Sequence, residues 1–350
     1  MKHFIGIDVA SEVCAVTAMS NSGQVVLQCM AKTEANELKT AVKSVSKPRI
    51  VVFEECCQAA WLYSIFEPLC EDIIVCNPKK NKDLSGHSKS DKSDSYNLAE
   101  RARGGHLSRV WHGCEELHIL RERLKLYEQL TKESTSLKNK IKAVFRGRGI
   151  TVGDGIYTAD KRVELVKSLP FDAQRERVLC SGELLDEVSK RREKAKLALV
   201  EAARKHPRFD RLMEIPQIGE ISAASIIATV GSAERFRTRK QFWSYCGFAV
   251  VTHETGQFAI DDFGRIKQKD RKIRTRGLVR QYNRQLKYIF KNAAVKLCSQ
   301  DWMEQYEKLR SNGVSVENAK LTIARKISAV ALKILKTGEH YDEKLVFSSK

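Results

Sequence analysis

The chain has 350 residues, of which 42% are hydrophobic, and its formal net charge is +19 with a pI near 9.5. This length and composition exclude a single small core and predict two or three domains. A positive charge this large favours a polyanionic partner. We therefore expect the ligand to contain phosphate groups and its binding to weaken as the salt concentration rises.

Cysteine usage and hydropathy exclude two further classes of protein. The ten cysteines include the adjacent pair Cys56 and Cys57 but no CxxC spacing, which argues for reduced thiols rather than a zinc site or a disulfide framework. The N-terminus lacks the apolar core of a signal peptide, and no apolar run is long enough to cross a bilayer. We therefore expect a cytoplasmic, nucleoid-associated protein with no membrane partner.

Residues 1–112 predict an α/β domain. Apolar runs, turn signals and helical spacings follow the order three strands, helix, strand, helix, strand. The expected strands are Phe4–Val9, Val13–Met19, Val25–Met30, Arg49–Phe53 and Asp72–Val75, and the expected helices are Glu34–Val45 and Ala59–Leu69. A lysine-rich loop after Pro78 then leads to a helix that ends at Gly104 and Gly105. This is the order of the ribonuclease-H-like fold.

Four acidic residues of this domain predict a metal site. Asp8 and Glu54 each follow an apolar strand, and Asp91 and Asp94 are three residues apart on a predicted helix, where their side chains face the same way. Carboxylates held this close repel one another unless a cation or a shared proton lies between them. Oxygen ligands suit Mg²⁺, and Mg²⁺ beside carboxylates suits phosphodiester chemistry.

The two strand-end acids also have alternative explanations. Asp8 can serve only to cap a turn, and a Gly-Ile-Asp strand end also opens the actin-like and sugar-kinase ATPases. Those ATPases need glycine-rich phosphate loops further along the chain, which this sequence lacks. Glu55 competes with Glu54, because the run Val51–Phe53 is apolar throughout. The position directly after the run favours Glu54.

Residues 113–205 predict two long helices. Apolar residues at coiled-coil spacing form one seam from Leu117 to Val144 and a second from Leu185 to Ala202, which Arg192 interrupts. The glycine-rich segment 147–162 between them predicts a loop or hinge. The spacing leaves open whether the helices pair with each other, as an antiparallel hairpin, or with a partner chain.

Residues 206–350 predict a mostly helical unit that binds nucleic acid. The segment from Met213 to Gly231 predicts helix, tight turn and helix, similar to a helix-hairpin-helix that binds a phosphate, with Gln217 at the first glycine's place. An ordinary packed hairpin is the alternative. Basic residues recur among aromatic ones throughout this unit, and a second basic patch lies at the end of the first long helix. The candidate nucleic-acid-binding residues are Lys138, Lys142, Arg146, Arg148, Gly219, Arg235, Arg237, Arg239, Lys240, Arg265, Lys267, Arg271, Lys272, Arg274 and Arg276.

Seven motifs, taken in order, resemble those of one known family. They are FIGIDVAS, VVFEECCQAAWL, NPKK, KSDKSDSYNLAERAR, IPQIGEISAASIIATVG, FRTRKQFWSYCGF and TRGLVRQYNRQLKYIFKNAA. The chain is similar over nearly its whole length to the DEDD-type insertion-sequence transposases, which include the Piv DNA invertase and the bridge-RNA-guided recombinases. The resemblance implies a RuvC-like catalytic domain, a coiled coil and a C-terminal transposase domain. It also implies a dimer or tetramer that acts on donor and target DNA duplexes with a structured non-coding RNA.

The resemblance implies roles for particular residues as well. Asp8, Glu54, Asp91 and Asp94 would bind Mg²⁺, and a serine of the C-terminal domain, supplied by a different subunit, would attack the scissile phosphate. Where that serine is expected, after the CGF segment, this chain has Thr255. Either Thr255 is a working nucleophile, or strand cleavage is lost and the protein only binds nucleic acid. A RuvC-like nuclease that uses water, and needs only the four acids, is a third explanation.

Overall fold

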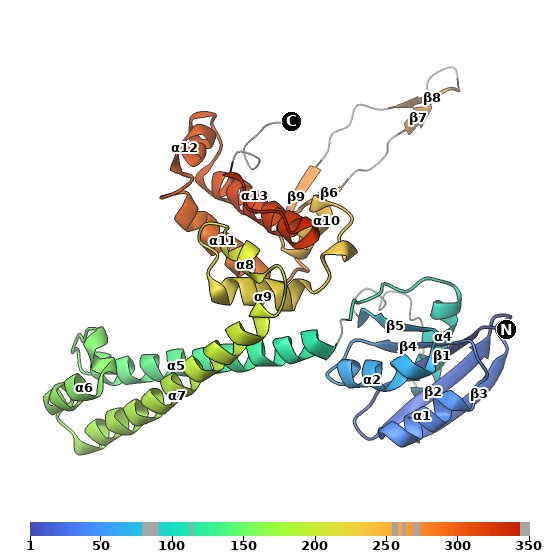
Figure 1. The fold of residues 1–350 in the computed structure, drawn as a ribbon, viewed down its shortest axis with the longest axis horizontal. Coiled ribbons are helices and arrows are strands. Elements are labelled where there is room, and N and C mark those ends of the chain that lie inside the picture. Colours follow the sequence, from blue (N-terminus) through green and yellow to red (C-terminus); the bar gives the residue numbers. More distant parts are fainter. Residues whose placement is uncertain (79–90, 113–114, 254–257, 261–263, 269–273, 344–350) are drawn as a thin grey trace. The chain divides into compact units, whose positions relative to one another are not determined.

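The computed structural model describes residues 1–78, 91–112, 115–253, 258–260, 264–268 and 274–343. The chain divides into two units, Met1–Cys114 and Glu115–Lys350 (Figure 1). Within the described ranges, no helix combines the length and the apolar character that a membrane span requires.

The first unit is built on a five-stranded mixed sheet. The strand order is β3-β2-β1-β4-β5, in which β2 is antiparallel to β1 and to β3, whereas β1, β4 and β5 are parallel. The order of elements predicted from the sequence is confirmed, and the sheet with its helices is ribonuclease-H-like. The elements are β1 (His3–Asp8), β2 (Val13–Ser20), β3 (Val25–Lys32), α1 (Ala35–Lys43), β4 (Arg49–Glu54), α2 (Ala59–Phe66), the 3-10 turn η1 (Glu67–Leu69), β5 (Asp72–Cys76) and α4 (Asp91–Arg103).

Two helix ends show how proline and glycine set the boundaries. The helix predicted over 59–69 ends at Phe66, because Pro68 has no amide hydrogen to continue the α-helical ladder and the chain tightens into η1. Helix α4 ends at Arg103, and Gly105 takes a φ of +71°, the left-handed conformation that glycine adopts most easily. The predicted lysine-rich loop over 79–90 lies outside the described residues.

Each face of the sheet has its own core. Ile5, Val51 and their neighbours on one face are buried against α1 and α2. On the other face, Phe4 and Val52 are buried with Leu98 of α4. Because side chains alternate along each strand, residues of β1 and β4 that share a face with Val52 point toward α4.

Helix α4 lies directly on β1 because Gly6 has no side chain. A Cβ atom at Gly6 would be 2.1 Å from the carbonyl oxygen of Ser95 and 2.6 Å from the amide nitrogen of Ala99. A buried hydrogen bond of 2.8 Å joins the hydroxyl groups of Ser95 and Thr17 on β2. These contacts fix the N-terminal half of α4 over the middle of the sheet.

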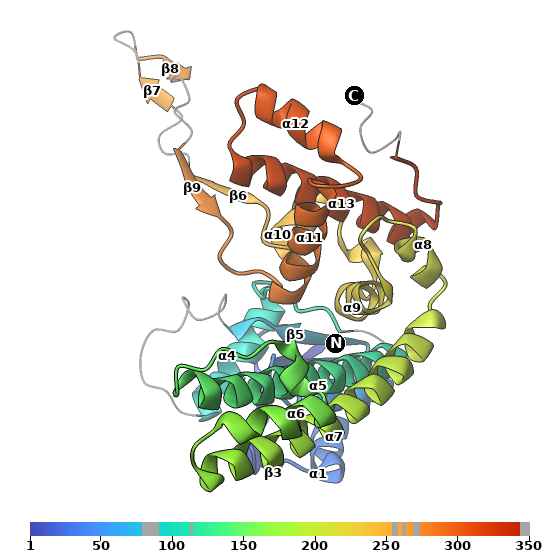
Figure 2. The same ribbon diagram turned by 90° about the vertical axis from the view of Figure 1, so that its left-hand side faces the viewer.

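The second unit begins with an antiparallel helical hairpin of α5 (Glu115–Arg146) and α7 (Asp172–Arg204) (Figures 1 and 2). Leu124, near the start of α5, is buried in one cluster with Leu199, near the end of α7. Ile141, near the end of α5, is buried with Val178, near the start of α7. The two predicted seams therefore meet each other within one chain, which decides in favour of the hairpin.

The loop predicted over 147–162 is wrong in its second half, which is helical and packed. Ile156 and Leu169 are fully buried with the ends of the two long helices. The nearly buried guanidinium of Arg162 donates to both carboxylate oxygens of Asp186 on α7, at 3.0 and 2.9 Å. Glycines end α5, but the apolar residues after them close the tip of the hairpin. The elements at this tip are η3 (Asp154–Tyr157), α6 (Ala159–Leu165) and η4 (Val166–Ser168) (Figure 2).

The rest of the second unit is mostly helical, as predicted, but strands interrupt it. Strand β6 pairs with β9 and β7 with β8, both antiparallel, and we call these four strands the β-ribbon. Part of the basic run therefore forms strands. The elements are α8 (Phe209–Met213), α9 (Glu220–Val230), η5 (Ala233–Arg235), α10 (Arg239–Tyr245), β6 (Val250–His253), β7 (Phe258–Ile260), β8 (Ile266–Gln268), β9 (Arg274–Leu278), α11 (Arg284–Leu297), α12 (Met303–Ser311) and α13 (Val316–Thr337).

The contact between Gly6 and α4 can be tested by adding a single methyl group. Gly6→Ala is expected to lower the free energy of unfolding by about 1–3 kcal/mol in a urea titration, because backbone atoms of α4 must move. Gly153→Ala is the control: its Cβ would have open space at a φ of −76°, so a change below about 0.5 kcal/mol is expected. Equal stability of Gly6→Ala and the natural protein would contradict the contact.

Candidate active site

The first two candidate acids, Asp8 and Glu54, are neighbours at the end of two parallel strands. Gly6 lies opposite Val52, and Ile7 lies opposite Phe53, so Asp8 and Glu54 come next in the same register. Two-residue alternation puts both acids on the face of Gly6 and Val52, which α4 covers.

Helix α4 adds a third acid. Asp94 directly precedes Ser95, whose carbonyl oxygen lies against Gly6 and whose hydroxyl bonds to Thr17. The backbone contact that holds α4 on β1 therefore carries Asp94 toward the strand-end acids. Asp91 is the first residue of α4, one helical turn before Asp94, and its side chain lies outside the described part.

The electrostatics of Glu54 show that these acids converge. Burial is the main cause that raises the pKa of Glu54, and the negative charges of Asp8 and Asp94 raise it further. Arg101, seven residues after Asp94 on α4, acts in the opposite direction and lowers that pKa. Arg101 was not among the candidates, although its helical spacing from Asp94 predicts the same face.

Glu55 has a different set of contacts. Its side chain is 42% exposed, and Oε2 lies 2.7 Å from Nε2 of His112. The ring of His112 stacks on Tyr63 of α2, with ring centroids 5.6 Å apart. Glu55 therefore takes part in a separate contact with the segment that follows α4, whereas Glu54 is coupled to Asp8 and Asp94.

The described acids form an open group. Over the described ranges, no three acidic, histidine or cysteine side chains already surround a common point as metal ligands do. Burial is the main reason that the pKa of Glu54 is raised, and the charges of Asp8 and Asp94 add to it; a cation here would favour the ionised carboxylates. The donor set consists of carboxylate oxygens, which hard divalent cations prefer.

Several candidate nucleic-acid-binding residues make contacts within the protein. Lys138 and Lys142 lie 4.9 and 5.3 Å from the ring centroid of Tyr157 at the hairpin tip, and Arg148 lies 4.6 Å from that of Phe171. The guanidinium of Arg235 lies 4.5 Å from the ring centroid of Phe236 and 4.6 Å from that of Tyr245. These cations therefore help to hold their own unit together.

Other candidates are exposed or outside the described part. Arg146, Arg237, Arg239, Lys240 and Arg265 are exposed to solvent. Lys267 lies in β8, and Arg274 and Arg276 lie in β9. Thr255, Arg271 and Lys272 fall outside the described residues.

The predicted helix, turn and helix around Gly219 are present as α8 and α9. Gln217, at the first glycine's place, takes a φ of 67°, the left-handed conformation that glycine usually supplies. Its amide donates to Gln300 and Asp301 at 2.8 and 3.2 Å, which fixes the turn. A Cβ added at Gly219 would meet nothing within 4 Å, so the turn is open at that residue.

A ribonuclease-H-like sheet with converging acids, followed by a basic helical region, is typical of an enzyme that binds and cleaves nucleic acid. Family comparisons agree: residues 5–148 match a DEDD transposase model of the IS110 type, described as "Transposase", and residues 209–307 match the model described as "Transposase IS116/IS110/IS902 family". The chain belongs to the IS110 family of DEDD transposases.

Two relatives show the extent of the similarity. The "Transposase for insertion sequence element IS1111A" of Coxiella burnetii is 25% identical over 259 residues, which cover 72% of this chain and 70% of that protein. The "Probable family 20 transposase" of Pseudomonas aeruginosa is 24% identical over 268 residues, which cover 72% and 75%.

The coupling of Glu54 to its neighbours predicts a pH-dependent stability difference. In the presence of a chelator at pH 7, Glu54→Gln is expected to be more stable than the natural protein, because it removes a carboxylate whose ionisation is opposed. A pKa raised in the folded state means that the native protein binds this proton more tightly than the unfolded chain does. The natural protein therefore regains stability as the pH falls through the raised pKa toward 4.5, the ordinary value.

The measurement is urea unfolding of both proteins between pH 4.5 and 7. The advantage of Glu54→Gln should shrink as the pH falls. Glu55→Gln, which breaks the contact with His112, is the matched control and should give no gain at pH 7. If the difference in free energy of unfolding between Glu54→Gln and the natural protein stayed constant across this pH range, the electrostatic coupling of Glu54 to Asp8 and Asp94 would be contradicted.

Proposed function

We propose that this transposase is Mg²⁺-dependent and that it cleaves and exchanges DNA strands under the guidance of a structured non-coding RNA. The observation that carries this proposal is the convergence of Asp8, Glu54 and Asp94 at the ends of strands β1 and β4, where the charges of Asp8 and Asp94 add to the effect of burial on the pKa of Glu54. A cation between these carboxylates would remove their repulsion.

Asp8, Glu54 and Asp94, together with Asp91 one turn earlier on α4, would hold the ion. Bound there, Mg²⁺ would stabilise negative charge on the phosphoryl oxygens and on the leaving oxygen during strand cleavage. Arg101, which already lowers the pKa of Glu54, would keep the carboxylate ionised and ready to accept the ion.

Thr255 would supply the nucleophile. Its Oγ would form a bond to phosphorus while the bond from phosphorus to one deoxyribose oxygen breaks, and the threonine proton would pass to solvent as the leaving oxygen gains one. The strand would stay covalently attached until a hydroxyl group of another strand reverses the step. The threonine methyl group restricts χ1, so a serine in the same place would be expected to work at least as well.

RNA guidance and oligomerisation rest on the resemblance and on charge. A formal net charge of +19 exceeds what solubility requires, and a complex with donor DNA, target DNA and RNA brings together many phosphates. A dimer or tetramer would allow Thr255 of one subunit to serve the acids of another.

Magnesium binding can be measured without any strand chemistry. At a Mg²⁺ concentration one hundred times the dissociation constant, the natural protein should be stabilised by about 2.7 kcal/mol against thermal unfolding. Asp94→Asn should show a smaller shift because it removes one ligand, whereas Glu37→Gln, which removes an acid on α1, should respond like the natural protein. Equal shifts in all three proteins would show that the acids do not bind the ion.

Strand exchange can be followed in cells by amplifying the rejoined ends of the native locus. Asp94→Asn and Thr255→Ala are each expected to lower the yield of junctions by about 10²-fold or more, because each removes an interaction used in the transition state. Thr255→Ser should retain junctions. Thr252→Ala, which changes an exposed threonine of β6, is the matched control.

The outcomes separate the three explanations. Junctions that need the acids but survive in Thr255→Ala would indicate water as the nucleophile. Junctions absent from the natural protein but present in Thr255→Ser would indicate a binding protein in which strand cleavage has been lost.

A further inference from the structure

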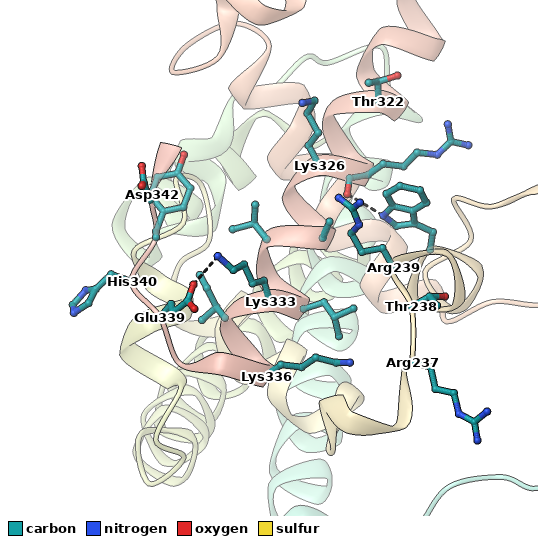
Figure 3. A pocket seen from close by; sticks show the side chains of 17 residues that line it. Arg237, Thr238, Arg239, Thr322, Lys326, Lys333, Lys336, Glu339, His340 and Asp342 are labelled. Atoms are coloured by element: carbon teal, nitrogen blue, oxygen red, sulfur yellow. Dashed lines mark hydrogen bonds and ion pairs between the residues drawn. The ribbon is translucent and has the colours of Figure 1, made fainter. Parts of the chain in front are cut away.

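A basic groove lies in the second unit between α13 and the segment that leads into α10 (Figure 3). Its volume is about 780 Å³. Six cationic side chains and only two carboxylates, Glu339 and Asp342, line it. The cations are Arg237, Arg239, Arg325, Lys326, Lys333 and Lys336. We infer that this groove binds an unpaired stretch of nucleic acid.

Arg325, Lys333 and Lys336 are held in place by the protein and form walls of the groove. Arg325 donates to the carbonyl oxygen of Phe248 at 2.9 and 2.6 Å, and Lys336 donates to that of Phe236 at 2.6 Å. Lys333 forms a 2.6 Å ion pair with Glu339 (Figure 3). Because only one of these partners carries a negative charge, the groove keeps a large excess of positive charge.

The exposed cations lie at the mouth of this groove. Arg237 and Arg239 flank Thr238 before α10, and both are exposed. Lys326 lines the groove from α13, and burial lowers the pKa of its ammonium group. A phosphate nearby would favour the charged form of Lys326, so ligand binding would offset the cost of its burial.

The same groove offers aromatic and apolar surface for a base. Trp243 lines it, and the indole N–H donates to the carbonyl oxygen of Arg325 at 3.0 Å, which holds the ring in place. The guanidinium of Arg325 lies 6.0 Å from the centroid of this ring, on one face. Ala329 and Val330 of α13, both half-buried, add apolar surface. Cations that follow a phosphate backbone, together with an aromatic face for bases, are the combination by which proteins bind single strands.

The size of the groove favours an unpaired strand over a duplex. Its volume of about 780 Å³ falls in the range of pockets that enclose small ligands, roughly 300–1,000 Å³. A base can enter such a concavity only when it is not paired. The groove offers the same phosphate and base-face contacts to a displaced DNA strand and to an RNA loop.

Glu339 allows a test in which affinity increases. Its carboxylate pairs with Lys333 inside the groove and would repel a phosphate. Glu339→Gln releases Lys333 and removes this repulsion, so it should strengthen binding about three- to tenfold. A gain of this kind cannot result from misfolding.

The experiment measures fluorescence anisotropy of labelled oligo(dT), oligo(U) and a DNA duplex, each of 12 nucleotides per strand, with the full-length protein over a range of salt concentrations. Arg239→Ala combined with Lys326→Gln should weaken single-strand binding about tenfold and lower the salt slope by roughly 1.4, or about 0.7 for each charge removed. Lys43→Gln, which removes an exposed lysine of the first unit, is the charge control and should bind as the natural protein does. Circular dichroism confirms that each variant is folded.

The proposal rests on the proposed nucleic-acid function but not on its strand chemistry, so Asp94→Asn should bind both single strands normally. If the double variant loses more affinity for oligo(dT), the groove binds a displaced DNA strand; if it loses more affinity for oligo(U), the groove binds an RNA loop. The groove proposal is overturned if the double variant and Glu339→Gln bind single strands like the natural protein, or if duplex binding falls equally. Duplex binding without single-strand binding would overturn the groove alone, whereas no binding to any oligonucleotide would overturn the proposed function too.

Discussion

The close contact between α4 and β1 is the constraint on which the candidate active site depends. Gly6 lets the backbone of α4 approach a strand of the central sheet, and the bond between Ser95 and Thr17 fixes the helix there. Asp94 comes next to Ser95 and so faces the acids that end β1 and β4. Repulsion among these carboxylates destabilises the fold locally, and the buried cores on both faces of the sheet offset this free-energy cost.

The positive charge of the chain has two uses. Arg162 and Arg235 are held by an ion pair or by aromatic rings, and Arg325 and Lys336 donate to backbone carbonyl groups. These cations stabilise the second unit, and those that contact only carbonyl groups or aromatic rings keep their positive charge. Arg237 and Arg239, by contrast, are exposed at a concave surface.

Helix α13 connects the groove with the base of the β-ribbon. Arg325 holds the carbonyl oxygen of Phe248, just before β6, and the same helix contributes much of the groove lining. Gly247 has a φ of 76°, and a Cβ atom there would be 2.6 Å from Tyr282. The start of the ribbon is therefore tightly packed where it leaves the helical part, and the position of Thr255 follows a few residues later.

The order of strands and helices in the first unit could be read from the sequence, because strands buried on both faces are short apolar runs and helices buried on one face have regular apolar spacing. The sequence also indicated the acids at the strand ends and the two long helices. Spacing does not specify which surfaces meet, so the folded structure was needed to show that α5 and α7 pair within one chain and that the hairpin tip is helical. Arg101 joins the acidic group at the strand ends. In the second unit, Thr322, Lys326 and Lys333 of α13 line one groove with Arg239. Both sites bring together residues that are far apart in the chain. Such contacts depend on distances in the folded protein, which local periodicity does not encode.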